Sequence, residues 1–132
     1  MLNGGTTKGM KASNTMAYIN GKFVFVEMDF GYQCPNTKDA HNIYISTSSS
    51  PTGPFSQRKI VYSIPDRING VLSNHYVINA HPQFDNGKNE LLVTYCLNYT
   101  GCTGVSPCTN NRTDPYYYQA KAVRIPLSIV GM

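Results

Sequence analysis

Residues 15–30, TMAYINGKFVFVEMDF, carry the strongest indication of the fold. The pair Asn20-Gly21 is a strong signal for a two-residue β-hairpin turn, and strand-like residues flank it on both sides. After the turn, even-numbered side chains from Val24 to Phe30 alternate with odd-numbered side chains from Phe23 to Asp29. A period of two places each set on its own face of a strand. The stretch therefore predicts a β-hairpin with an apolar face.

The same pattern occurs a second time along the chain. The strand-like runs 76–84 and 90–98 flank Asp85-Asn86-Gly87, so the two turns are offset by 66 residues (87 − 21). The run 23–30 aligns with 90–97, and in each copy a Cys-containing loop and a further strand follow. Further strands are expected at 43–48, 59–63 and 116–125, and no segment keeps a helical period beyond a turn or two.

Repeated antiparallel sheets are typical of propeller blades, which are units of about four strands. We therefore predict an all-β fold of antiparallel β-propeller blades. Residues 1–14 are expected to be a linker or loop, 15–70 one blade and 71–132 the last blade. A single β-sandwich with two similar hairpins is the alternative. Two blades have two open flanks, so we expect a fragment whose remaining blades come from missing sequence or another chain.

Composition narrows the classes of function. Among 132 residues the net charge is only +4, and Lys and Arg are scattered. A protein that neutralises nucleic-acid phosphates has a basic cluster, so we expect no nucleic-acid partner. No apolar run approaches the roughly 20 residues that a membrane-spanning helix needs, so we expect no membrane span.

The cysteines indicate an oxidising compartment. Cys34, Cys96, Cys102 and Cys108 form no CxxC pair, which argues against a structural zinc site and favours two disulfides. Three pairings are open, and we lean towards Cys102 with Cys108. Sequons for N-glycosylation begin at Asn98 and Asn111. We therefore expect a secreted or extracellular glycoprotein, although no signal peptide is visible after Met1, so the natural chain is expected to begin further upstream.

Several segments resemble a known superfamily. The run 43–55, IYISTSSSPTGPF, resembles the S-x-S-P-x-G-P-F blade segment of five-bladed propellers. The runs 79–84 (NAHPQF) and 90–98 (ELLVTYCLN), followed by Arg124-Ile125-Pro126-Leu127, resemble a last blade of that kind. These propellers belong to the arabinanase, β-xylosidase and levansucrase-like glycoside hydrolases and their uncharacterised secreted relatives. The similarity extends over 15–127, with departures at Thr94, where Ser is usual, at Cys96, and in the final strand 118–123.

The resemblance implies two blades of about five and a carbohydrate-active or carbohydrate-binding protein. In the catalytic families the three essential carboxylates lie on the first three blades, so no catalytic residue is expected in this chain. It also implies that His81 faces a central channel and helps to hold an ion, such as calcium, through water; contact with backbone groups beside Pro82 is the alternative. A non-catalytic extracellular protein for adhesion or assembly is the rival function, and a small self-sufficient sandwich is a third interpretation.

Four residues are candidates for contact with a sugar. Glu27 and Asp29 point to the same side of one strand, and paired acids are the groups that cleave glycosides, although two acids on one strand more often solvate an edge. Tyr95 and Asn98 lie where a strand meets a loop. An aromatic ring stacks on sugar rings and an amide both donates and accepts hydrogen bonds, although Tyr is also a common filler between blades.

Overall fold

The computed structural model describes residues 13–29, 41–98, 104, 108–110 and 112–132. Within these ranges the protein is all-β, as predicted. The strands are β1 (Ser13–Ile19), β2 (Lys22–Met28), β3 (His41–Ser48), β4 (Lys59–Ile64), β5 (Arg67–Ile68), β6 (Val71–Leu72), β7 (Asn74–His81), β8 (Glu90–Asn98), β9 (Cys108–Thr109), β10 (Arg112–Thr113) and β11 (Gln119–Pro126). Two 3-10 helices, η1 (Pro82–Phe84) and η3 (Leu127–Val130), follow β7 and β11.

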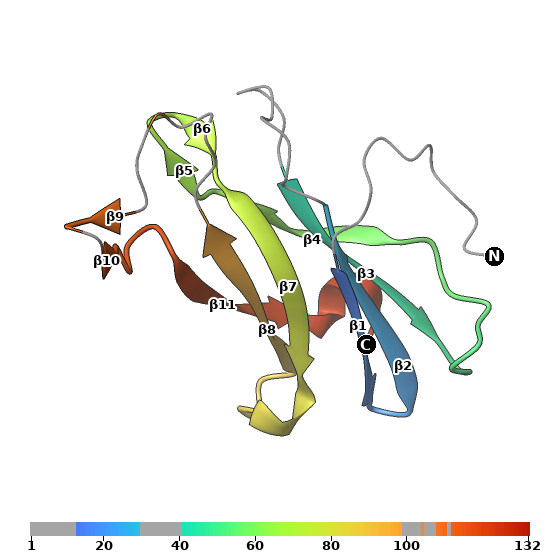
Figure 1. The fold of residues 1–132 in the computed structure, drawn as a ribbon. Coiled ribbons are helices and arrows are strands. Elements are labelled where there is room, and N and C mark those ends of the chain that lie inside the picture. Colours follow the sequence, from blue (N-terminus) through green and yellow to red (C-terminus); the bar gives the residue numbers. More distant parts are fainter. Residues whose placement is uncertain (1–12, 30–40, 99–103, 105–107, 111) are drawn as a thin grey trace.

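Two antiparallel sheets make up most of the molecule. The first has four strands in chain order, β1-β2-β3-β4, and the second has three, β7-β8-β11. The short hairpins β5–β6 and β9–β10 lie in the connections between these strands. Figure 1 shows the two sheets beside each other, each with its first strand next to the other sheet. Neither of these described sheets closes on itself.

The first hairpin forms as its sequence predicts. Ile19 pairs with Lys22, and the two turn residues between them, Asn20 and Gly21, have φ values of 49° and 79°. Two successive positive φ angles define a type I′ turn, whose twist matches that of the flanking strands. Asn and Gly adopt this conformation at low cost, which explains why the chain reverses here.

The core lies between the facing sides of the two sheets. Val24, Val26 and Met28 of β2 are fully buried, which confirms the predicted apolar face of that strand. They form one cluster with side chains of β3, of the second sheet and of η3: Ile43, Ile45, Ile78, Leu91, Val93, Tyr95, Ile125 and Leu127. Alternating apolar residues on both sheets thus bury each other, as in any two-layer β structure.

The edge strands β1 and β7 fix how the sheets meet. The backbones of the two sheets approach each other closely where β7 runs beside β1 and β2, and η3 lies against β3 and β4. Figure 1 shows β1 and β7 running in the same direction, and the end of β1 lies against η1, which follows β7. The turns that end β1 and β7 therefore lie at one end of the molecule.

Most strand bounds follow the sequence, and two differ for a physical reason. The strand expected over 76–84 ends at His81, because Pro82 has no backbone N–H for a ladder and begins a 3-10 turn. The strand expected over 116–125 begins only at Gln119, since the preceding residues form a turn in which Tyr117 N donates to Asp114 O. The predicted boundary at 70/71 falls at the turn of the β5–β6 hairpin. Residues 1–12 lie outside the described part.

We predict that the interface between the sheets dominates stability. Replacing Ile45, which is 1% exposed, with Ala should lower the free energy of unfolding by about 2–5 kcal/mol, since it leaves a cavity in the core. The matched control is Ile60→Ala on β4, where the side chain is 57% exposed and the change should cost under about 1 kcal/mol. Urea denaturation measures both, and equal losses would contradict this location of the core.

Candidate functional site

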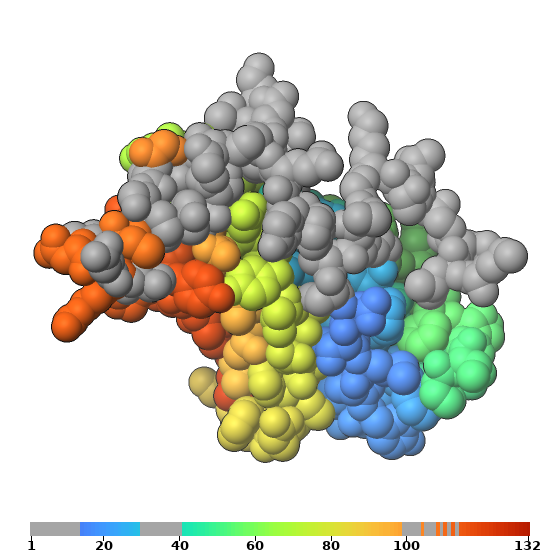
Figure 2. Space-filling model, viewed as in Figure 1, coloured from blue at the N-terminus to red at the C-terminus, as the bar shows by residue number. Residues whose placement is uncertain are grey.

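An open cleft of about 390 Å³ lies at the end of the molecule where β1 and β7 finish. Its polar and aromatic lining comes from Tyr18 and Asn20 of the first hairpin and from Asp85, Asn89 and Glu90 in and after the turn between β7 and β8. Figure 2 shows the yellow atoms after β7 beside the blue atoms of the first hairpin. The cleft thus exists only because the two sheets place their turns at the same end.

Tyr18 provides the aromatic surface of the cleft. Its side chain is 61% exposed, and its ring packs at 4.8 Å, centroid to centroid, on the ring of Phe23 in the neighbouring strand. This contact supports one side of the ring while leaving surface exposed to solvent. An exposed, supported aromatic ring is a suitable platform for the apolar face of a ligand.

Two asparagines join the turns on either side of the cleft. Asn20 Nδ2 donates to Asn89 Oδ1 over 3.3 Å, and Asn89 Nδ2 donates to the carbonyl of Met132 over 2.9 Å. The backbone of Asn89 also accepts a hydrogen bond from Leu127 N. The C-terminal turn therefore holds the second turn in place against the first.

Two carboxylates complete the lining. Asp85 Oδ1 accepts a hydrogen bond of 2.9 Å from Gly87 N, and Glu90 Oε2 accepts one of 2.8 Å from Asn86 Nδ2. Each carboxylate is thereby oriented by one oxygen while its other oxygen can accept a ligand donor. A cleft with a ring, amides and oriented carboxylates can hold a polar ligand that has hydroxyl groups and an apolar face.

A second polar cluster lies between the sheets at the opposite end. Nδ1 of His41, the first residue of β3, is 3.2 Å from Nδ1 of His75 in β7, and both side chains are buried. The pKa of His75 is lowered to about 4, chiefly because burial disfavours its charged form and next because His41 is adjacent; Asp66 acts in the opposite sense. His75 is therefore neutral at pH 7.

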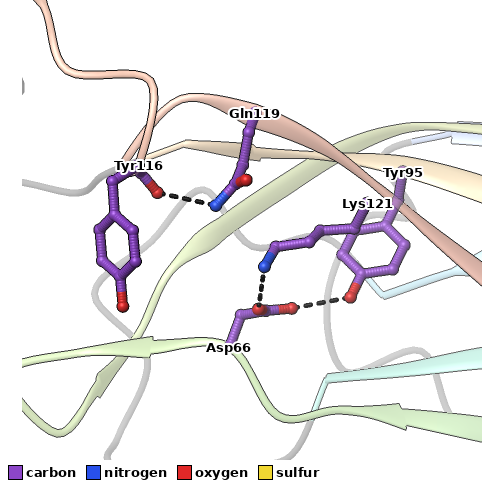
Figure 3. Close-up of polar contacts among 5 residues, drawn as sticks. All are labelled: Asp66, Tyr95, Tyr116, Gln119 and Lys121. Atoms are coloured by element: carbon purple, nitrogen blue, oxygen red, sulfur yellow. Dashed lines mark hydrogen bonds and ion pairs between the residues drawn. The ribbon is translucent and has the colours of Figure 1, made fainter.

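Tyr95, Asp66 and Lys121 form a satisfied network next to this pair (Figure 3). Tyr95 Oη donates to Asp66 Oδ2 over 2.7 Å, and Lys121 Nζ lies 3.3 Å from Asp66 Oδ1. Burial, and then the hydrogen bond to Asp66, raises the pKa of Tyr95, so the phenol stays protonated. Nearby, Gln119 Nε2 donates to the carbonyl of Tyr116 and fixes the start of β11. The network joins β8 and β11 to the segment between β4 and β5.

Comparison with models of protein families assigns the chain to a family. A model described as a domain of unknown function, DUF5005, matches residues 6–124, which is 119 of 132 residues (124 − 6 + 1). The chain belongs to the DUF5005 family. The match runs from before β1 into β11, so both sheets belong to this domain. Comparison with curated proteins and with solved structures gives no match.

In this DUF5005 chain, Glu27 and Asp29 lie away from the cleft. Glu27 is buried in β2, and Asp29 follows that strand. Asp29 Oδ2 accepts hydrogen bonds from the backbone N of Asn42, at 3.0 Å, and from Tyr44 Oη, at 2.9 Å. The Tyr44 ring in turn stacks under Arg58 at 4.4 Å. These contacts give Asp29 a structural role, holding the start of β3 to the end of β2, and a role in sugar binding stays a prediction.

Tyr95 and Asn98 differ in how deeply they are buried. Tyr95 is 2% exposed, which leaves no ring face for a sugar and supports the packing role that was the alternative. Asn98, the last residue of β8, is half-buried and lies opposite Asn74 in the sheet. The rest of its sequon and Asn111 are outside the described residues, so glycosylation stays a prediction.

His81 is the last residue of β7. Its Nε2 is 2.8 Å from Thr94 Oγ1, and its Nδ1 is 3.4 Å from Gln83 Nε2. Within the described ranges no three His, Cys, Asp or Glu side chains group so that they could hold a metal. The channel ion that the resemblance implies therefore stays a prediction.

The cysteines are only partly described. Cys96 has a free thiol on the side of β8 away from the core. Cys34 and Cys102 fall outside the described residues, so the lean towards a bond between Cys102 and Cys108 stays a prediction. In the described part of the chain, no helix has the length and hydropathy to cross a membrane.

Sequence reasoning treated the cleft residues as turn residues only. The turns at Asn20 and Asp85 were expected, and their φ values and hydrogen bonds fit that interpretation. Nothing in the local sequence indicates that these two turns meet, because that depends on β1 and β7 running side by side. The missed signal is the repeat itself, since equivalent hairpins in neighbouring repeats end at the same side.

We predict that the Tyr95 hydroxyl stabilises the fold measurably. Tyr95→Phe removes the donor to Asp66 and should lower the free energy of unfolding by about 1–3 kcal/mol, because a buried hydrogen bond to a charged group is lost. Tyr18→Phe is the control, since that phenol is exposed and should change stability by no more than about 0.5 kcal/mol. Chemical denaturation measures both variants, and a neutral Tyr95→Phe would refute the network's role.

Proposed function

We propose that this chain supplies two neighbouring blades of a β-propeller and binds carbohydrate in the cleft between their turns. The observation that carries the proposal is the cleft, where the exposed ring of Tyr18 lies with Asn20, Asp85, Asn89 and Glu90. In this proposal the protein works outside the cell, as the cysteines and sequons predict.

The arrangement of strands supports the blade interpretation. Each sheet is a meander whose strands follow chain order, and the first strand of each lies beside the first strand of the other. Both of these edge strands run in the same direction. Propeller blades are successive meanders whose inner strands surround one channel in this way, whereas Greek-key sandwiches interleave strands from distant parts of the chain.

An apolar hollow on the first sheet also supports further blades. On the side of the first sheet away from the core, Met16, Phe25 and Phe55 line a hollow of about 460 Å³ together with Pro51 and Pro54. The rings of Phe25 and Phe55 lie 5.7 Å apart, and Met16 is exposed. Apolar surface of this kind on a soluble protein commonly marks an interface, and a preceding blade would cover it.

The chemistry of the cleft favours an uncharged sugar over a phosphorylated or sulfated ligand. Sugar hydroxyls need partners that accept and donate, which carboxylates and amides provide. The C–H face of a pyranose needs an exposed ring, which Tyr18 provides. Among the described residues, no Lys or Arg side chain lines the cleft to attract a phosphate or a sulfate. The proposal is therefore one of binding, and any hydrolysis would need carboxylates from outside this chain.

We predict that Tyr18→Ala weakens binding to oligosaccharides by about tenfold or more, because loss of a stacked ring removes on the order of 1.4 kcal/mol. The wild-type ligand is first found on a glycan array, and affinities are then measured by calorimetry. Asp85→Asn keeps an acceptor for Gly87 N and should weaken binding without loss of the turn.

Tyr116→Ala is the matched control, because Tyr116 is 70% exposed but lies outside the cleft, and it should bind as the wild type does. Equal affinity of wild type and Tyr18→Ala for every bound glycan would refute the cleft as the site. A wild-type array without any bound glycan would refute carbohydrate binding itself.

A further inference from the structure

The pair His41–His75 joins the two sheets at the end opposite to the cleft. His41 lies two residues before Ile43 and so on the core face of β3, and His75 lies opposite Leu97, a core residue of β8. Their ring centroids are 5.4 Å apart and the ring planes are nearly perpendicular, at 87°. One imidazole from each sheet therefore meets the other directly across the interface.

The short distance between the two Nδ1 atoms requires one histidine to donate a hydrogen bond to the other. Two neutral imidazoles can form this 3.2 Å contact only if one Nδ1 carries a proton and the other accepts it. Nε2 of His75 is buried without a hydrogen-bond partner. A buried orphan N–H costs more than a bare acceptor, so the less costly arrangement has His75 Nδ1–H donating to His41 Nδ1.

Among the described residues, the charged groups near the pair already have partners of their own. Tyr95 of β8 faces His75 edge-on at 5.9 Å, and its hydroxyl is already bonded to Asp66. Asp66, between β4 and β5, is the nearby anion and is already paired with Lys121 of β11. Tyr62 of β4 lies near Tyr95. From β2, Glu27 alternates with Val26 and Met28 and so points to the other face of its sheet.

We propose that His41 and His75 form an acid-sensitive latch between the two sheets. At neutral pH the shared proton holds β3 against β7. Acid must add a proton to His41 Nδ1, which breaks the hydrogen bond, or to His75 Nε2, which is buried among core side chains. A second proton would create two cations at hydrogen-bond distance, and the rings would then separate and open this end of the interface.

The lowered pKa of His75 determines how the stability of the fold depends on pH. The unfolded chain takes up a proton near pH 6.5, whereas the folded chain resists it until about pH 4. The unfolded state therefore binds more protons in this window, and stability falls as the pH falls from about 6.5 to about 4. The equilibrium constant for unfolding should rise by about 100-fold over that range through this group.

The chain has only three histidines, so the proposal can be tested by direct titration. Proton NMR of the full chain resolves three imidazole signals, which single variants assign. In the wild type, the His75 signal should not titrate between pH 7 and pH 5, and signals from Tyr95 should shift together with it below pH 5. A His75 signal that titrates above pH 6 while the protein stays folded would overturn the latch.

Variants then separate the latch from ordinary acid lability. His75→Asn places an amide donor where His75 Nδ1 lies, and His75→Phe keeps the volume; whichever folds should lose most of the 100-fold dependence on pH. His81→Asn removes the one histidine outside the pair and should keep the full dependence. Equal acid sensitivity of the wild type and the His75 variants would refute the proposal, and none of these outcomes depends on whether the cleft binds sugar.

Discussion

The packing of the two sheets against each other determines the rest of this structure. Val24 and Val26 on one sheet and Leu91 and Val93 on the other are buried only because the sheets face each other. The sheets meet at β1 and β7, which run in the same direction. This geometry brings the two hairpin turns together at one end and His41 against His75 at the other. One constraint on apolar burial therefore creates both polar sites.

Much of the local structure could be predicted from the sequence, because the physical causes are local. Asn20-Gly21 requires positive φ angles, and the alternation in β2 requires one buried face, and both appear as expected. The meeting of distant turns depends on packing between the repeats, so Tyr18 and Asn89 were not recognised as neighbours. The burial of Tyr95 agrees with the packing role that was its alternative, but its position in the strand does not reveal that Asp66 lies within reach of its hydroxyl.

The two hairpins align differently when their strands β2 and β8 are compared in place of their sequences. Sequence alignment paired Phe23 with Glu90, but β2 begins at Lys22 and β8 begins at Glu90, each directly after its turn. Pairing these first residues makes Phe25 the counterpart of Val93. In the proposed blade arrangement, one face of each sheet contacts the preceding blade and the other the following blade. Val93 faces the preceding sheet here, so Phe25 occupies the equivalent face of the first sheet, which is the one with the apolar hollow.

The polar groups between the sheets differ in how completely they are satisfied. The Asp66 carboxylate has partners for both oxygens, and such a network joins strands without leaving a buried charge unpaired. By contrast, His75 Nε2 and Ser73 Oγ are buried without a partner. A pair of aliphatic side chains in place of the histidines would fill the interface without that penalty. The histidine pair is therefore a poor choice for maximal stability at neutral pH, and what it adds to this interface is a response to protons that an apolar pair does not have.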